Sequence, residues 1–354
     1  MKTLLKVENL QTQFRLGKKT IRAVNGVSFS IAEGEVLGLV GESGCGKTVT
    51  SLSIMRLIES PGEITGGEVI FHDKGTQIDL LKLSDKALED ILGTRIAMIF
   101  QDPMTSLNPV LTIGFQIAET LRVHRRFSNR DAKEKAIDLL QKVEIASRRF
   151  DDYPHEFSGG MRQRVMIAMA IACEPKLLIA DEPTTALDVT TQAQILNLLR
   201  KFKKELKVSV IIITHDLGVV AQLADKVAVM YAGRIVEIAP VKDIFERPQH
   251  PYTQALVASI PRLGFQGERF PTIEGAQPRL SEDFIGCSFY PRCDSRVGIC
   301  ASETPVLKQT FPRQSAACFV AQVKVPNGSV NIGTAGDSSA TSRKRSEENA
   351  LNSV

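Results

Sequence analysis

The chain has 354 residues, of which 43% are hydrophobic and 24% are charged, as is ordinary for a soluble globular protein. The formal net charge is only +4 and tryptophan is absent, which argues against a nucleic-acid-binding face. The N-terminus carries no secretory segment, and no apolar run approaches the roughly 20 residues of a membrane span. We therefore expect a cytosolic protein whose six cysteines form no disulfide framework.

Two segments with strand character, 7–14 and 23–31, come first and are predicted to be edge strands. A short apolar run over 36–40 predicts a buried strand. The letters GESGCGKT follow directly at 41–48 and match G-x-x-x-x-G-K-[ST] at every fixed position. A helix is predicted over 49–58, so strand, glycine-rich turn and helix supply the context that a phosphate-binding loop requires.

This loop predicts a nucleotide site, because glycines let backbone N–H groups converge on phosphates and the helix N-terminus adds positive potential. Lys47 is expected to reach the β- and γ-phosphates, and the Thr48 hydroxyl to ligate Mg²⁺. Upstream, Phe14 offers a ring on which adenine stacks, and a core position is an equally good interpretation of it. The predicted nucleotide-binding residues of the loop are Gly41, Ser43, Gly44, Cys45, Gly46, Lys47 and Thr48.

Strand patterns continue over 66–71 and 96–100, and the second of these ends at Gln101. From about 104 to 175 the apolar spacing becomes helical. Within this region Ser158 stands at an N-cap position, and the two glycines after it expose the backbone N–H groups of a long apolar helix. That start predicts a second anion site, and an ordinary capped helix is the alternative.

The next buried strand pattern ends in two carboxylates. Asp181 is expected to hold Mg²⁺ directly or through water, and Glu182 to act as general base on an attacking water. A further β-branched strand ends at His215. Because the carboxyl ends of parallel strands meet at one edge of an open sheet, we expect Gln101, Asp181 and His215 to lie at the same edge.

A hairpin is predicted over 227–238, and beyond residue 240 prolines and turn residues multiply. We expect a small appended module that does not continue the sheet, and a disordered tail after about residue 325. Four cysteines in the module follow the spacing C-x5-C-x6-C-x17-C, for which an iron–sulfur cluster, zinc and free thiols in a small core are all open interpretations. These are Cys287, Cys293, Cys300 and Cys318.

The ordered set of motifs resembles the nucleotide-binding subunit of an ABC transporter over residues 1 to about 325. The family's signature sequence is represented by 157–161, where Met161 replaces the usual glutamine. The resemblance implies catalytic roles for Glu182, His215 and Gln101. It also implies Mg²⁺ ligation by Thr48, Gln101 and Asp181, and nucleotide contacts by Phe14, Gln101, Ser158, Gly159, Gly160, Asp181 and Asp188.

Segments 100–109, 153–156, 180–188 and 250–253 are similar to the peptide and nickel importers, and most of all to the D-type ATPase of dipeptide/oligopeptide permeases. The resemblance implies an α/β fold of the P-loop NTPase (RecA-like) class with an antiparallel β subdomain. It divides the chain into a nucleotide-binding domain over 1–258, with an inserted helical subdomain at about 104–175, and a C-terminal extension with the four cysteines over 259–325. A tail follows over 326–354.

The implied function is ATP hydrolysis coupled to uptake of di- or oligopeptides, with nickel or another small solute as the alternative. The implied partners are a second, related ATPase in a heterodimer, two transmembrane permease subunits and an extracytoplasmic peptide-binding protein, at the cytoplasmic face of the plasma membrane. The implied cofactors are ATP and Mg²⁺, with a [4Fe–4S] cluster in some members. Two other classes, a soluble non-transport ABC ATPase and a GTPase switch, fit less well: the first lacks its paired cassettes or coiled coils, and the second gives no reason for Ser158 and His215.

Overall fold

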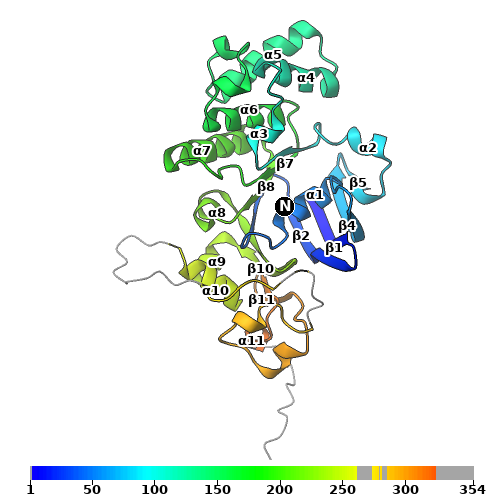
Figure 1. Cartoon of the computed structure of the whole chain (residues 1–354), viewed down its shortest axis with the longest axis vertical. Coiled ribbons are helices and arrows are strands. Elements are labelled where there is room, and N and C mark those ends of the chain that lie inside the picture. The colour runs from blue at the N-terminus through cyan, green and yellow to red at the C-terminus, as the bar shows by residue number, and fades with distance from the viewer. Residues whose placement is uncertain (1, 261–272, 279, 281–284, 324–354) are drawn as a thin grey trace, which may run out of the picture.

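In a computed structural model of the chain, residues 2–260, 273–278, 280 and 285–323 are described below (Figure 1). The expected tail, 326–354, lies outside these residues. One sheet is antiparallel, with strand order β2-β1-β4-β5. Its strands are β1 (Thr3–Leu16), β2 (Lys19–Ala32), β4 (Gly62–Asp73) and β5 (Thr76–Asp79). The prediction of an edge position is right for β2 and wrong for β1, which lies between β2 and β4.

The second sheet has eight strands in the order β11-β12-β10-β9-β3-β8-β7-β6. The five strands from β9 to the β6 edge are parallel, and they are almost entirely apolar because both faces of this part of the sheet are covered. The parallel strands are β3 (Val36–Val40), β6 (Ile96–Ile99), β7 (Leu177–Asp181), β8 (Ser209–Thr214) and β9 (Lys226–Tyr231). The antiparallel strands are β10 (Arg234–Pro240), β11 (Lys308–Phe311) and β12 (Gln314–Ala316).

The C-terminal module continues this sheet, so the prediction that it would not is wrong. Strand β12 pairs with β10 through Glu237 opposite Ala316 and Ile238 opposite Ser315. Without this partner, β10 would expose its backbone N–H and C=O groups along a free edge. The two module strands span only three and four residues, which is too short for an alternating pattern to identify them.

The helices of the N-terminal half lie beside the phosphate loop, next to β5 and in a helical lobe at one end of the molecule (Figure 1). They are α1 (Lys47–Ile54), α2 (Asp85–Glu89), α3 (Pro103–Ser106), α4 (Ile113–Arg125), α5 (Asn129–Lys142) and α6 (Gly159–Ile171). The later helices are α7 (Val189–Leu206), α8 (Leu217–Leu223), α9 (Val241–Glu246), α10 (Pro251–Ala258) and α11 (Phe319–Val323). Within the described part of the chain, no helix combines the length and the apolarity that a membrane crossing requires.

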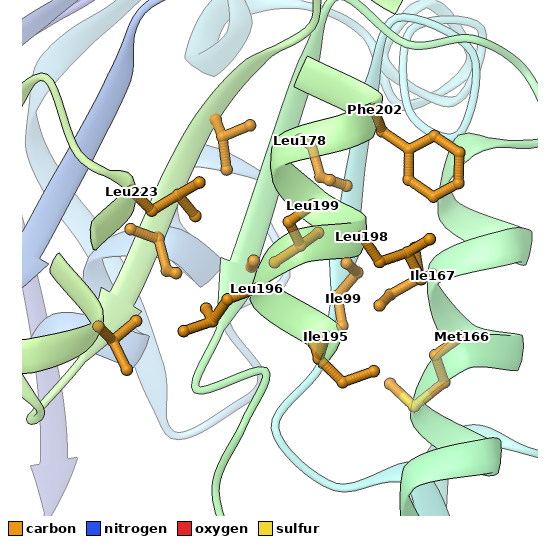
Figure 2. Packing of buried hydrophobic residues seen from close by; sticks show 14 of the residues in the cluster. Ile99, Met166, Ile167, Leu178, Ile195, Leu196, Leu198, Leu199, Phe202 and Leu223 are labelled. Carbon is orange, nitrogen blue, oxygen red and sulfur yellow. The ribbon is translucent and has the colours of Figure 1, made fainter. Parts of the chain in front are cut away.

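Two hydrophobic cores cover the two faces of the large sheet. Figure 2 shows the first, in which Leu198 of α7 lies beside Ile167 of α6. Along β3, Val36 and Val40 belong to this core, whereas Leu37 and Leu39 belong to the second core under the antiparallel sheet. The strand that leads into the phosphate loop is therefore fixed from both sides.

The module shares the first core with the rest of the chain. Phe289 is buried there, with its ring centroid 5.2 Å from that of Tyr231 at the end of β9 and 5.5 Å from that of Tyr252 in α10. Aromatic rings at such separations attract one another beyond the area that they bury. The module is thus packed directly against the end of the sheet.

Candidate functional site

The phosphate loop connects the end of β3 to the start of α1. Gly46 has φ +105°, and a Cβ atom there would lie 2.2 Å from the carbonyl oxygen of Ala23, so only glycine fits this position. The ammonium group of Lys47 donates to the carbonyl oxygens of Gly41 and Glu42 at 2.8 and 2.9 Å. Cys45, the variable residue of the motif, is completely buried in the second core.

The carboxyl ends of β6, β7 and β8 bring four predicted residues together. Glu182 accepts a hydrogen bond from Gln101 Nε2 at 3.1 Å, and its other carboxylate oxygen lies 3.2 Å from His215 Nδ1. One residue earlier, Asp181 Oδ1 accepts from Thr48 Oγ1 at 3.3 Å, which links this edge to the phosphate loop. The parallel strand order places these side chains together as expected, while their catalytic and metal-binding roles stay predictions.

The two carboxylates differ in environment. Burial raises the pKa of Asp181 to about 6, although the hydrogen bond from Thr48 acts in the opposite direction. Burial also acts to raise the pKa of Glu182, but hydrogen bonds from Thr185 and His215 outweigh it and hold that pKa below its usual range. Glu182 is therefore ionised at neutral pH, in the state that a general base needs.

Two features of Glu182 were not found from the sequence. Its backbone has φ +45°, a left-handed conformation that is rare outside glycine and is often found at functional sites. The Thr185 hydroxyl donates to the carboxylate at 2.8 Å, which fixes the side chain from a third direction. A threonine three residues after the acid is too common a spacing to predict this contact.

The predicted signature segment lies at the start of α6. Ser158 is the N-cap and accepts from Met161 N at 3.4 Å, as expected. A Cβ atom on Gly160 would lie 2.4 Å from the side chain of Thr191 in the first turn of α7, so this glycine permits close helix packing. Asp188, the N-cap of α7, accepts from Thr191 N at 3.0 Å. The signature segment and Asp188 thus lie beside each other, and Gly160 packs on α7.

Phe14 occupies β1 and is half-buried, outside both large cores among the described residues. A Cβ atom on Gly62 would lie 2.6 Å from its ring, so the ring lies against the start of β4. Part of the ring remains accessible, and adenine stacking stays a prediction.

The four module cysteines line one small cavity of about 10 Å³, next to Phe289 and His250. Three are buried and Cys287 is half-buried, and burial raises the pKa of the Cys287 thiol to about 11. Thiols are the ligand type that an iron–sulfur cluster or zinc takes, so the residue types lining this cavity suit either group. However, no group of three or more His, Cys, Asp or Glu side chains in the described ranges is arranged to hold a metal ion.

Comparison with known proteins gives the same picture along most of the chain. A family described as "ABC transporter" matches residues 24–185, and "Oligopeptide/dipeptide transporter, C-terminal region" matches residues 236–300. A Sinorhizobium fredii protein described as a probable peptide ABC transporter ATP-binding protein is 54% identical over 321 residues, covering 89% of this chain and 94% of the relative. A dipeptide transport ATP-binding protein of Bacillus subtilis is 52% identical over 303 residues, covering 85% and 89%.

The chain belongs to the family of peptide ABC transporter ATP-binding proteins. Among solved structures, a dimeric ATP-binding cassette, MJ0796, bound to ADP and phosphate is similar with a TM-score of 0.60 and 30% identity, over 67% of this chain and 99% of that one. The protein cbiO1 of Clostridium perfringens, described as part of the ABC transporter complex cbiONQ, has a TM-score of 0.59 and 28% identity, over 70% of this chain and 93% of that one.

These likenesses confirm the predicted fold class, an ABC nucleotide-binding domain of the P-loop NTPase type. Family membership makes this ATP-binding subunit an ATPase that uses ATP and Mg²⁺. It also implies membrane association, a membrane permease as partner and pairing of two ATPase subunits.

Proposed function

We propose that this subunit lies at the cytoplasmic face of the plasma membrane, where it hydrolyses ATP to drive the uptake of di- or oligopeptides into the cell. The observation that carries the ATPase part is Glu182, an ionised carboxylate held between Gln101 and His215 at the sheet edge that borders the phosphate loop. The peptide part is supported by the match to the oligopeptide/dipeptide transporter C-terminal region and by the names of the relatives, which favour peptides over nickel.

The chain's own groups suggest how the reaction is prepared. Thr48, Gln101 and Asp181 would hold Mg²⁺, which when bound neutralises phosphate charge. The Lys47 ammonium group would exchange the two backbone carbonyls that it now contacts for phosphate oxygens. Glu182 would accept the proton of the attacking water, while its neighbours keep the carboxylate in one orientation.

A complete site requires a second ATPase subunit. The start of α6 packs on α7 through Gly160. Figure 1 shows α6 between the helical lobe and α7, whereas α1, which follows the phosphate loop, lies beside the antiparallel sheet. We propose that the start of α6 serves the nucleotide of a related partner ATPase, in a heterodimer bound to two permease subunits that receive peptide from an extracytoplasmic binding protein. No nucleic acid takes part in this scheme.

We also propose that the nucleotide-binding domain ends at residue 258, where α10 ends, with the helical subdomain at about 104–175. The extension over 259–325 would bind a [4Fe–4S] cluster through its four cysteines, which is supported by the cavity that they share. Iron, sulfide and zinc analysis of anaerobically purified protein tests this. Stoichiometric zinc without iron would overturn the assignment.

The ATPase proposal is tested by Glu182→Gln in the assembled transporter. We expect ATP to bind as in the unmodified protein, while hydrolysis falls by roughly 100-fold or more because the general base is lost. Uptake of labelled dipeptides into vesicles should fall in parallel, with nickel uptake measured beside it. Normal hydrolysis by the variant would remove Glu182 from this role.

A further inference from the structure

One ion pair joins the C-terminal module to the phosphate loop. Arg292, next to Cys293, donates from both terminal nitrogens to the two carboxylate oxygens of Glu42, at 2.9 and 3.1 Å. Glu42 is the second residue of the loop, and the two partners are 250 positions apart in the sequence. A bidentate pair of this kind fixes both distance and orientation.

Every N–H donor of the Arg292 guanidinium group has a hydrogen-bond acceptor. A guanidinium has five N–H donors, and those of Arg292 find five acceptors. Besides the two Glu42 oxygens, these are the backbone oxygens of Glu274 at 2.9 Å and Ile273 at 3.0 Å, and the Tyr231 hydroxyl at 3.4 Å. Only 5% of the Arg292 side chain is exposed. A lysine has three donors in a different geometry and could not replace this set.

Glu42 also contacts the lysine of the loop, Lys47, through its backbone. Its backbone N–H donates to the Tyr252 hydroxyl at 2.9 Å, and its carbonyl oxygen accepts from the Lys47 ammonium group at 2.9 Å. Gln277 also donates to its carboxylate. The residue held by Arg292 is thus in direct contact with the lysine expected to bind phosphate.

Charge gives the contact a second role. Burial acts to raise the pKa of Glu42, but hydrogen bonds from Arg292 and Gln277 outweigh it and hold that pKa below its usual range, so the carboxylate is ionised. Without the guanidinium, an unpaired negative charge would stand in the loop that must accept a triphosphate. Arg292 both positions and neutralises this residue.

We propose that Arg292 is a positioning residue of the ATP site, through which the C-terminal module holds the phosphate loop in its binding conformation. This inference rests on the proposed ATPase function, because it assigns a further residue to that same site. The module then contributes directly to nucleotide affinity.

The test is Arg292→Ala in the full-length chain, with the dissociation constant measured for a fluorescent ATP analogue and Mg²⁺, and with KM and kcat measured in the assembled transporter. We expect the dissociation constant and KM to rise about tenfold, a modest part of what breaking a buried ion pair can cost. kcat should change much less, since the Glu182 edge is untouched. A merely structural role would lower the unfolding temperature without this split between KM and kcat.

Arg296→Ala is the matched control. Arg296 belongs to the same module and carries the same charge, but it donates to the carbonyl oxygen of Cys293 at 3.2 Å and does not contact the loop. Its removal should leave ATP affinity unchanged. In the double variant Arg292→Ala with Glu42→Gln, affinity should partly recover, because the unpaired charge is gone. A double variant no better than Arg292→Ala alone would overturn the neutralising role of Arg292.

Unchanged ATP affinity in Arg292→Ala would also overturn it. If that variant does not fold, Arg292→Lys keeps the charge but loses the bidentate geometry, and native affinity in this variant would equally count against the proposal. The two hypotheses can fail separately. If the unmodified protein binds no ATP, the proposed function is wrong. If the unmodified protein and Arg292→Ala both bind ATP normally, only the role of Arg292 is wrong.

Discussion

Replacing Asp181 by asparagine should stabilise the protein in the absence of nucleotide and metal, and the gain should depend on pH. The Asp181 side chain is 1% exposed, and burial raises its pKa from an ordinary 3.8 to about 6. Asparagine has nearly the same shape and can accept the hydrogen bond from Thr48, but it cannot ionise. The variant therefore avoids the cost of a buried charge.

The sign and size follow from the two pKa values. A carboxyl whose pKa is higher in the folded state than in the unfolded state destabilises the fold when it ionises. The penalty is complete above about pH 6, shrinks as pH falls toward 3.8, and is absent below that. A difference of about two units between the pKa of Asp181 in the folded and in the unfolded state corresponds to a loss of folding stability of about 3 kcal/mol near pH 7, and of about half that near pH 5.

Thermal unfolding of the full-length protein in a metal chelator is the assay. Each kcal/mol is worth roughly 2–4 °C for a domain of this size, so Asp181→Asn should unfold several degrees higher near pH 7 and show a smaller gain near pH 5. Asp188→Asn is the control, because this exposed carboxylate has its pKa lowered by hydrogen bonds from Thr191 and should bring no gain. An unchanged unfolding temperature near pH 7, or a gain independent of pH, would refute the reasoning.

Three further outcomes are expected. Gly46→Ala should abolish ATP binding, because its Cβ would lie 2.2 Å from a carbonyl oxygen, while Gly298→Ala, with open space around it, should bind normally in the same assay. His215→Ala should slow phosphate release by about tenfold or more with ATP binding retained, since Glu182 loses a partner at 3.2 Å; equal loss of binding would contradict this. Glu237→Ala should lower the free energy of unfolding by about 3 kcal/mol or more, because three donors, two of them buried, lose their acceptor, and calorimetry showing a native unfolding temperature would argue against it.

Local patterns in the sequence predicted the centre of the molecule well. The apolar run at 36–40 coincides with β3. The strands leading to Gln101, Asp181 and His215 were recognisable because buried parallel strands form continuous apolar runs, and they lie side by side as expected. Gly41 and Gly46 of the loop mark positions where no side chain fits. Such features depend on neighbouring residues, which a sequence displays directly.

Features that depend on distant partners were missed. The pairing of β12 with β10 and the contact of Arg292 with Glu42 join segments far apart, and neither leaves a local signal. The central position of β1 was missed for the same reason, because β4 comes more than 40 residues later. The left-handed backbone of Glu182 reflects its surroundings and not its residue type.

The strand pairing at the far side of the large sheet also bears on how the protein can be shortened. Strand β10 is covered by only three residues of β12, and these in turn by β11. A fragment cut after α10 would present bare β10 to any other chain carrying the same bare strand, and edge-to-edge association leads to aggregation. Fragments intended for biochemical work should therefore keep the last short hairpin, even where interest is confined to the nucleotide.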